Sequence, residues 1–124
     1  MEPKDLKRRT QDFAIAIIMM VRKFPKSIDG YEIGKQIIRS GCSVGANYRS
    51  ARRGRSSAEF ISKLKISEEE ADETEYWLEI IKAVELDQTN SVDSLLKEAN
   101  ELVSILTASG KTAKQNLERE KQKK

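Results

Sequence analysis

Apolar and small residues recur at alternating steps of four and three along four stretches of this chain. This spacing keeps each set on one face of a helix and suits helices that pack lengthwise against one another. No stretch alternates in the manner of a strand, so the pattern predicts an all-α fold. The members of the four sets are Leu6, Thr10, Phe13, Ile17, Met20 and Phe24; Ile33, Ile37, Gly41, Val44, Tyr48 and Ala51; Phe60, Leu64, Ser67, Ala71, Thr74, Leu78 and Ile81; and Val92, Leu95, Ala99, Leu102 and Leu106.

Three interruptions separate the helices. Pro25 is expected to end the first helix, Gly54 the second and the polar run 87–91 the third. The basic tail 118–124 is expected to fray, because the apolar stripe stops at Leu117. The candidate N-caps are Ser27 or Asp29, Ser56 or Ser57, and Ser91. The helices are predicted over residues 5–24, 29–53, 57–86 and 92–117.

The length of 124 residues predicts a single domain, 1–124, with one modest core. Short connections between long helices favour antiparallel neighbours. We therefore expect an antiparallel up-down-up-down four-helix bundle.

Two features bear on the cellular compartment. The apolar run Phe13–Val21 covers nine residues, which is too few to cross a bilayer, and no cleavage site of small residues follows it. The single cysteine, Cys42, excludes an internal disulfide. We expect a cytoplasmic protein that has no membrane partner.

The chain contains no histidine, which excludes the commonest catalytic and metal-binding arrangements. The stretch SGCSVGAN lacks the spacing of a phosphate-binding loop. In the acidic run EEEADETEYWLE, Glu70 with Glu73 or Glu75 with Glu79 could chelate a cation, but an exposed acidic face is the ordinary interpretation. We predict that the protein is not an enzyme and takes no metal or cofactor.

Further apolar residues flank the main stripes. Ile61 lies on one flank of the third helix, and Trp77, Ile80 and Val84 lie on another. A four-helix monomer needs only one broad apolar face on each helix, so this surplus favours contacts between subunits. A wide core stripe within a monomer is the alternative.

Charge is strongly segregated, although the net charge is only +3. Residues 1–65 hold fifteen Lys and Arg against six Asp and Glu, residues 66–109 hold two against twelve, and residues 110–124 hold six against two. In an up-down-up-down bundle, the starts of helices one and three lie beside the ends of helices two and four. Most of the basic residues would then gather at one end of the molecule.

A cationic end of this kind is a candidate for contact with nucleic-acid phosphates, because the planar fork of arginine matches phosphate oxygens. A tyrosine beside the arginines could stack on a base. The alternative is a solvated charged end, or one that pairs with acids of a neighbouring subunit. The candidate residues are Arg49, Arg52, Arg53, Arg55, Lys63, Lys65 and Tyr48.

Several motifs occur in order between residues 37 and 81: RSGCSVGAN, an arginine-rich turn, SSAEFISKL and EADETEYWL. Together they resemble the four-helix-bundle family of 23S rRNA intervening-sequence proteins, also called S23 ribosomal proteins. The matching positions are Arg39, Ser40, Ser43, Val44, Ala46 and Asn47; Ser56, Glu59, Phe60, Ile61, Lys63 and Leu64; and Glu70, Ala71, Glu73, Thr74, Tyr76, Trp77 and Leu78.

The resemblance implies a small antiparallel bundle that assembles into a homopentameric ring. A related branch of the family serves as the accessory protein of a diversity-generating retroelement, where it works with a reverse transcriptase and nucleic acid. Most members have no established biochemical activity. Ser50 stands where some members carry Glu, so no role of that acid carries over to this chain.

The small residues before the arginines are interpreted as a packing device. They allow the second helix to approach its neighbours closely, at some cost in helix propensity. Asn47 is expected to form a hydrogen bond across the bundle. The residues assigned to helix packing are Gly41, Ser43, Gly45, Ala46 and Asn47.

Two functions are consistent with these features. The first is a non-enzymatic, homo-oligomeric bundle that binds RNA or DNA through its basic end in a structural or accessory role. The alternative is a protein-interaction scaffold without direct nucleic-acid binding. In that case the charge serves subunit assembly or a partner of the reverse-transcriptase type.

Overall fold

Four helices and short connections make up residues 2–123, the part of the chain described by this computed structural model. No strand occurs in that range, so the fold is all-α, as predicted. Met1 and Lys124, which the predicted domain includes, lie outside the described residues. The helices are α1 (Pro3–Val21), α2 (Ile28–Arg52), α3 (Ser57–Ala83) and α4 (Val92–Gln122).

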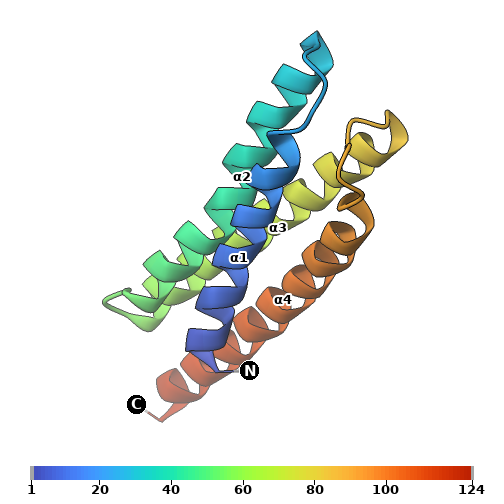
Figure 1. Cartoon of the computed structure of the whole chain (residues 1–124). Coiled ribbons are helices and arrows are strands. Elements are labelled where there is room, and N and C mark those ends of the chain that lie inside the picture. The colour runs from blue at the N-terminus through green and yellow to red at the C-terminus, as the bar shows by residue number, and fades with distance from the viewer. Residues whose placement is uncertain (1, 124) are drawn as a thin grey trace.

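The connections alternate between the two ends of the molecule. The α1–α2 and α3–α4 connections lie at one end, and the α2–α3 connection lies at the other, with both ends of the chain (Figure 1). α3 packs extensively against α2 and α4, whereas α1 packs on α2 and touches α4 only lightly. Within residues 2–123, no helix combines the length and the apolarity needed to cross a bilayer.

The core consists of the predicted stripes. Most of the stripe residues are buried, and Leu86 joins them from the α3–α4 connection. Four stripe residues near helix ends are only partly buried but still pack against the core: Phe24, Ile33, Phe60 and Val92. The period of the apolar pattern therefore identifies the inward face of every helix.

α2 and α3 begin at serine caps. Ser27 Oγ accepts the N–H of Gly30 at 3.1 Å, and Ser56 Oγ accepts the N–H of Glu59 at 3.1 Å. Each serine satisfies one of the amide groups that have no partner inside the first turn of a helix. Ser27 rather than Asp29, and Ser56 rather than Ser57, therefore fixes the start of its helix.

α1 and α3 each end three residues before their predicted ends. α1 stops at Val21, and the chain tightens before Pro25: the N–H groups of Lys23 and Phe24 bond to carbonyls three residues back instead of four. α3 stops at Ala83 because Glu85 takes a left-handed conformation with φ 59°. The N–H of Leu86 then reaches back to a carbonyl of the last full turn, which is a Schellman motif.

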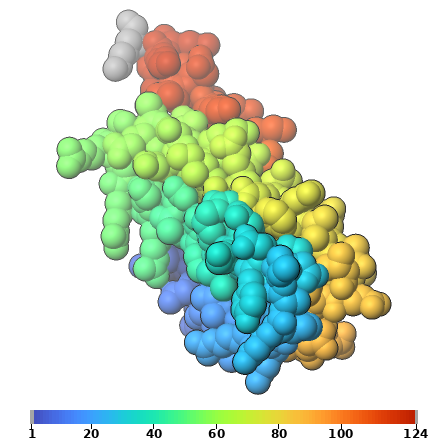
Figure 2. All heavy atoms as spheres, turned by 90° about the horizontal axis from the view of Figure 1, so that it is seen from above, coloured from blue at the N-terminus to red at the C-terminus, as the bar shows by residue number. Residues whose placement is uncertain are grey.

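α4 runs to Gln122, so the prediction that the tail frays is wrong for residues 118–122. The segment is rich in Lys, Glu, Gln and Arg, which favour a helix without any apolar stripe. The last turns of α4, red in Figure 2, project beyond the rest of the molecule.

Candidate nucleic-acid interface

Two glycines of α2 let it approach α1 closely. A Cβ on Gly41 would lie 2.6 Å from Ile17 Cδ1, and a Cβ on Gly45 would lie 3.0 Å from Thr10 Oγ1. The first distance is far inside ordinary van der Waals separation and the second is a few tenths of an ångström inside it, so a larger residue would force the helices apart or displace a side chain. Gly41 and Gly45 are thus the predicted packing residues that lie at the crossing.

The other three predicted packing residues are Ser43, Ala46 and Asn47. Ala46 is exposed, and Ser43 Oγ donates to the carbonyl of Arg39 in its own helix at 2.7 Å. Asn47 Nδ2 donates to the carbonyl of Ser43 at 2.9 Å. The predicted hydrogen bond of Asn47 across the bundle is therefore wrong, because the amide finds its partner one turn back in α2.

Buried hydroxyls make the hydrogen bonds that link α2 to α3. Thr74 Oγ1 donates to Ser40 Oγ at 2.9 Å, and Ser67 Oγ donates to the carbonyl of Val44 at 2.6 Å. The sequence did signal this, since Ser67 and Thr74 occupy stripe positions where apolar residues are expected. A hydroxyl at such a position needs a partner once it is buried.

An ion-pair cluster adds a second link between α2 and α3. Arg39 Nη1 lies 3.0 Å from Glu70 Oε2, and its Nη2 contacts Glu73. Trp77 Nε1 donates to Glu73 Oε2 at 3.0 Å; this bond and the guanidinium of Arg39 lower the pKa of Glu73. Glu70 and Glu73, considered above as a cation-chelating pair, both face an arginine.

The four residues predicted to form a subunit interface differ in exposure. Trp77 is partly buried against the protein's own core, and Ile61 and Ile80 are also partly buried. Val84 is 49% exposed. Much of the Trp77 surface is therefore already covered within one chain.

Other exposed apolar side chains lie on α1 and α3, and the sequence pattern did not single them out. Ile15 and Met19 lie one turn apart on α1 and are 50% and 53% exposed. Ile66 and Tyr76 on α3 are 37% and 54% exposed. The apolar residues of these helices are so dense that periodicity alone does not separate a half-buried flank from an outward face.

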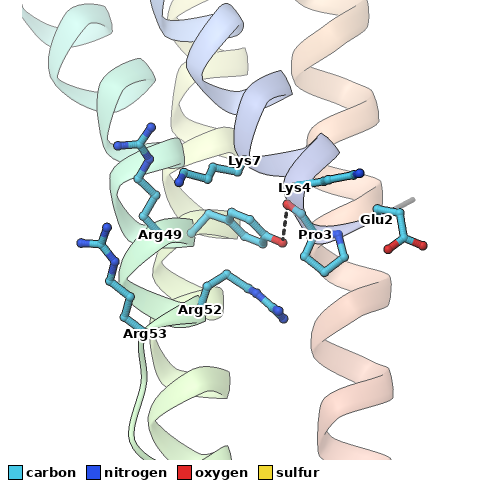
Figure 3. A pocket seen from close by; sticks show the side chains of 8 residues that line it. Glu2, Pro3, Lys4, Lys7, Arg49, Arg52 and Arg53 are labelled. Atoms are coloured by element: carbon cyan, nitrogen blue, oxygen red, sulfur yellow. Dashed lines mark hydrogen bonds between the residues drawn. The ribbon is translucent and has the colours of Figure 1, made fainter.

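The start of α1 and the end of α2 form a groove of about 380 Å³, hereafter the α1–α2 groove (Figure 3). Its lining residues are Glu2, Pro3, Lys4, Lys7, Tyr48, Arg49, Arg52 and Arg53. Three of the predicted arginines thus come together, and two lysines outside the predicted set join them. The sequence did indicate these lysines, because they make the first turns of α1 basic. The order of the helices brings these turns beside the end of α2.

Tyr48 is only 4% exposed, and its hydroxyl donates to the carbonyl of Pro3 at 3.3 Å. Burial raises the pKa of its phenol, and the nearby Arg52 partly offsets this. The prediction that Tyr48 stacks on a base is wrong, because its ring lies in the core stripe of α2. In the groove it serves as a fixed wall.

Five cations of the groove lack acidic partners. Within residues 2–123 no ion pair involves Lys4, Lys7, Arg49, Arg52 or Arg53. Arg49 Nη2 donates to the neutral Gln11 Oε1 at 3.1 Å. In contrast, Arg9 pairs with Glu98 at 2.6 Å and with Glu101 at 3.5 Å, and its hydrogen bond to Glu98 raises its pKa.

The remaining predicted residues lie elsewhere at the same end. Arg55 is exposed in the α2–α3 connection, and Lys63 is partly buried on α3. Lys65 pairs with Glu68 at 3.7 Å and lines a second groove of about 160 Å³ between α3 and α4. Lys111 and Lys114, outside the predicted set, also line this groove.

These features define a class: a small all-α protein whose described part forms four helices and gathers at one end basic residues that have no ion-pair partner within that part. The sequence profile described as 23S rRNA-intervening sequence protein matches residues 4–108. The chain belongs to this family, which confirms the resemblance seen in its motifs.

A solved structure supports the assignment. It is the crystal structure, at 1.70 Å resolution, of a protein of unknown function from the S23 ribosomal protein family of Bacteroides thetaiotaomicron. The two sequences are 34% identical, the match covers 90% of this chain and 99% of that chain, and the TM-score is 0.81. Comparison with curated proteins finds no match.

Proposed function

We propose that this protein is a non-enzymatic bundle that binds the phosphate backbone of RNA or DNA through its basic end, in a structural or accessory role. The observation that carries the proposal is the cluster of five cations around the α1–α2 groove that have no acidic partner among residues 2–123. Like charges held together repel one another, and an incoming polyanion relieves that repulsion. Arginine adds geometric fit, since its fork accommodates two phosphate oxygens.

The proposed assembly is an antiparallel up-down-up-down bundle in a homo-oligomeric, cytoplasmic complex, pentameric as the family resemblance implies. Exposed apolar residues on α1 and on α3 support an assembly of several copies. A ring would place several basic ends on one particle, which raises avidity for a long polyanion.

Binding of labelled single-stranded RNA and duplex DNA at two salt concentrations tests the proposal. The variant carries Arg49→Ser, Arg52→Ser and Arg53→Ser, and light scattering follows its mass. The control removes three exposed cations near the opposite end, through Lys23→Ser, Lys26→Ser and Lys35→Ser. Both variants lose the same net charge, so they separate a local site from overall charge.

We expect the wild type to bind with an affinity that falls steeply with salt, and the basic-end variant to bind at least about tenfold more weakly. The control variant should keep most of the affinity. Absence of binding by the wild type would refute the proposal. An equal loss of affinity in both variants would refute the assignment of binding to the basic end.

A protein-interaction scaffold is the second candidate. It is favoured by the exposed apolar residues Ile15, Met19, Ile66 and Tyr76, which nucleic-acid binding does not require. If the basic-end variant dissociated into monomers, the arginines would belong to a subunit interface and the scaffold function would stand.

A further inference from the structure

The α1–α2 groove is a half-open hollow on the surface of the basic end. Its volume of about 380 Å³ falls within the usual range of small-ligand sites. The Tyr48 ring forms part of its wall and is held by the bond to Pro3. Sites that grip single strands without sequence preference usually offer exposed aromatic rings for stacking. This groove offers charge instead.

The cations flank the groove on both sides. Lys7, Arg49 and Arg53 project to one side, and Lys4 and Arg52 project to the other (Figure 3). A terminal phosphate group carries a charge of about −1.5 to −2 at neutral pH and presents three acceptor oxygens. An internal phosphodiester carries a single charge and has two free oxygens. A small site with five cations suits the terminal group better.

Glu2 is the one acid that lines the groove. It lies beside Lys4, on the side away from Arg49 and Arg53 (Figure 3). A strand that ran through the groove would carry a phosphate past this carboxylate, and the like charges would repel. If the end of a strand lies in the groove, the rest of the strand extends toward Arg49 and Arg53. The positive charges there attract its phosphates.

From this arrangement we infer that the α1–α2 groove recognises a terminal phosphate group, on the end of a single strand of RNA or DNA or on a free nucleotide. The inference rests on the proposed function and narrows it, from contact with any backbone phosphate to recognition of an end.

The test compares short single-stranded RNAs of one sequence that carry a 5′-phosphate, a 3′-phosphate or hydroxyls at both ends. We expect the wild type to bind one of the phosphorylated strands about tenfold more tightly than the hydroxyl strand, as a set of charge-assisted hydrogen bonds would give. A variant with Lys4→Ser and Arg52→Ser should lose this preference. A variant with Lys23→Ser and Lys26→Ser should keep it.

The outcomes separate the inference from the proposed function. Equal binding of all three strands would refute end recognition and leave backbone binding intact. Failure of every strand to bind would refute both. Competition by a 5′-mononucleotide would identify a free nucleotide as an accepted ligand, whereas retained preference without such competition would restrict the ligand to strand ends.

Two further measurements distinguish recognition of the terminal phosphate from a purely structural role of these residues. Glu2→Gln is expected to raise the affinity for the hydroxyl strand more than for the phosphorylated strand, so the preference should fall severalfold; an unchanged preference would refute the directional argument. The preference should also shrink below about pH 6, where the terminal phosphate gains a proton. The hydroxyl strand controls for titration of the protein, which contains no histidine.

Discussion

Asp87 caps α4, a role that the sequence suggested for Ser91. Its Oδ2 accepts the N–H of Ser91 at 2.6 Å and the N–H of Val92 at 2.8 Å. Its Oδ1 accepts the N–H of Thr89 at 2.8 Å. Burial alone would raise the pKa of Asp87, but the hydrogen bonds from Thr89, Val92 and Ser91 outweigh it and lower the pKa below its ordinary value of 3.8. One carboxylate thus orders the whole α3–α4 connection.

Asp87→Asn is expected to lower the free energy of unfolding by about 1 kcal/mol at neutral pH, because a neutral amide accepts weaker hydrogen bonds than a carboxylate. The folded state has the lower pKa, so this stabilisation is present above the unfolded value of about 4 and is lost as the pH falls through the folded value. Urea unfolding of both proteins at about pH 7 and pH 3 measures it. A difference between the two proteins that stayed constant with pH would contradict the assignment.

At the scale of the elements, the crossing of α1 and α2 depends on the absence of a side chain. Ile17 is fully buried, and its Cδ1 occupies the place where a Cβ of Gly41 would lie. The chain accepts the low helix propensity of glycine here in exchange for close packing. Gly110 offers a comparison, since a Cβ there would meet only Leu64 Cδ2 at 4.0 Å.

Gly41→Ala is expected to destabilise the protein by about 1 kcal/mol, because the clash with Ile17 exceeds the gain in helix propensity. Gly110→Ala should stabilise it by about 0.5–1 kcal/mol, since propensity acts there without a clash. In an Ile17→Val background, which removes Cδ1, Gly41→Ala should cost less. Urea unfolding of the single and double variants gives the coupling energy, and additive effects would refute the contact.

The helices show how far sequence reasoning reaches. Their number, inward faces and approximate extents follow from periodicity, because burying a stripe is the main constraint on a bundle. The exact ends do not, since Glu85 ends α3 in a left-handed conformation that the sequence does not mark with glycine. Asn47 shows the same limit, because periodicity gives a face but not the partner of a polar group.

At the scale of the molecule, charge counting predicted the basic end but not its internal arrangement. Arg9 belongs to the basic segment 1–65 in that count, although Glu98 and Glu101 of the acidic segment pair with it. A count of charges by segment cannot show which pairs form across helices. Arg49 and its neighbours remain available because no acid of another helix reaches them among the described residues.

The exposed apolar residues define two surfaces of one chain, one on α1 and one on α3. On α1, Met19 lies one turn from the cation Arg22 and Ile15 lies two turns from it; on α3, Ile66 and Tyr76 flank the acidic run. If one surface meets the other between copies, apolar contact and opposite charge act together. Such a head-to-tail contact closes into a ring when the rotation between copies allows it.

Ile15→Asp is therefore expected to reduce the mass measured by light scattering to that of a monomer, because it sets an acid against the acidic surface of α3. Helical content should stay unchanged, since Ile15 is 50% exposed. Ile28→Asp is the matched control, because Ile28 is 85% exposed at the start of α2 and lies outside both surfaces. It should leave the mass of the assembly intact.

A second change distinguishes contact between these two surfaces from a general effect of added charge. Tyr76→Lys places a cation on the α3 surface, opposite the new acid of Ile15→Asp in the neighbouring copy. If α1 of one copy meets α3 of the next, the double variant should recover part of the assembly that Ile15→Asp loses, by about 1 kcal/mol for each interface at low salt. A double variant that stays monomeric, or a wild type that is itself monomeric, would refute this pairing of surfaces, and the exposed residues would then need another partner.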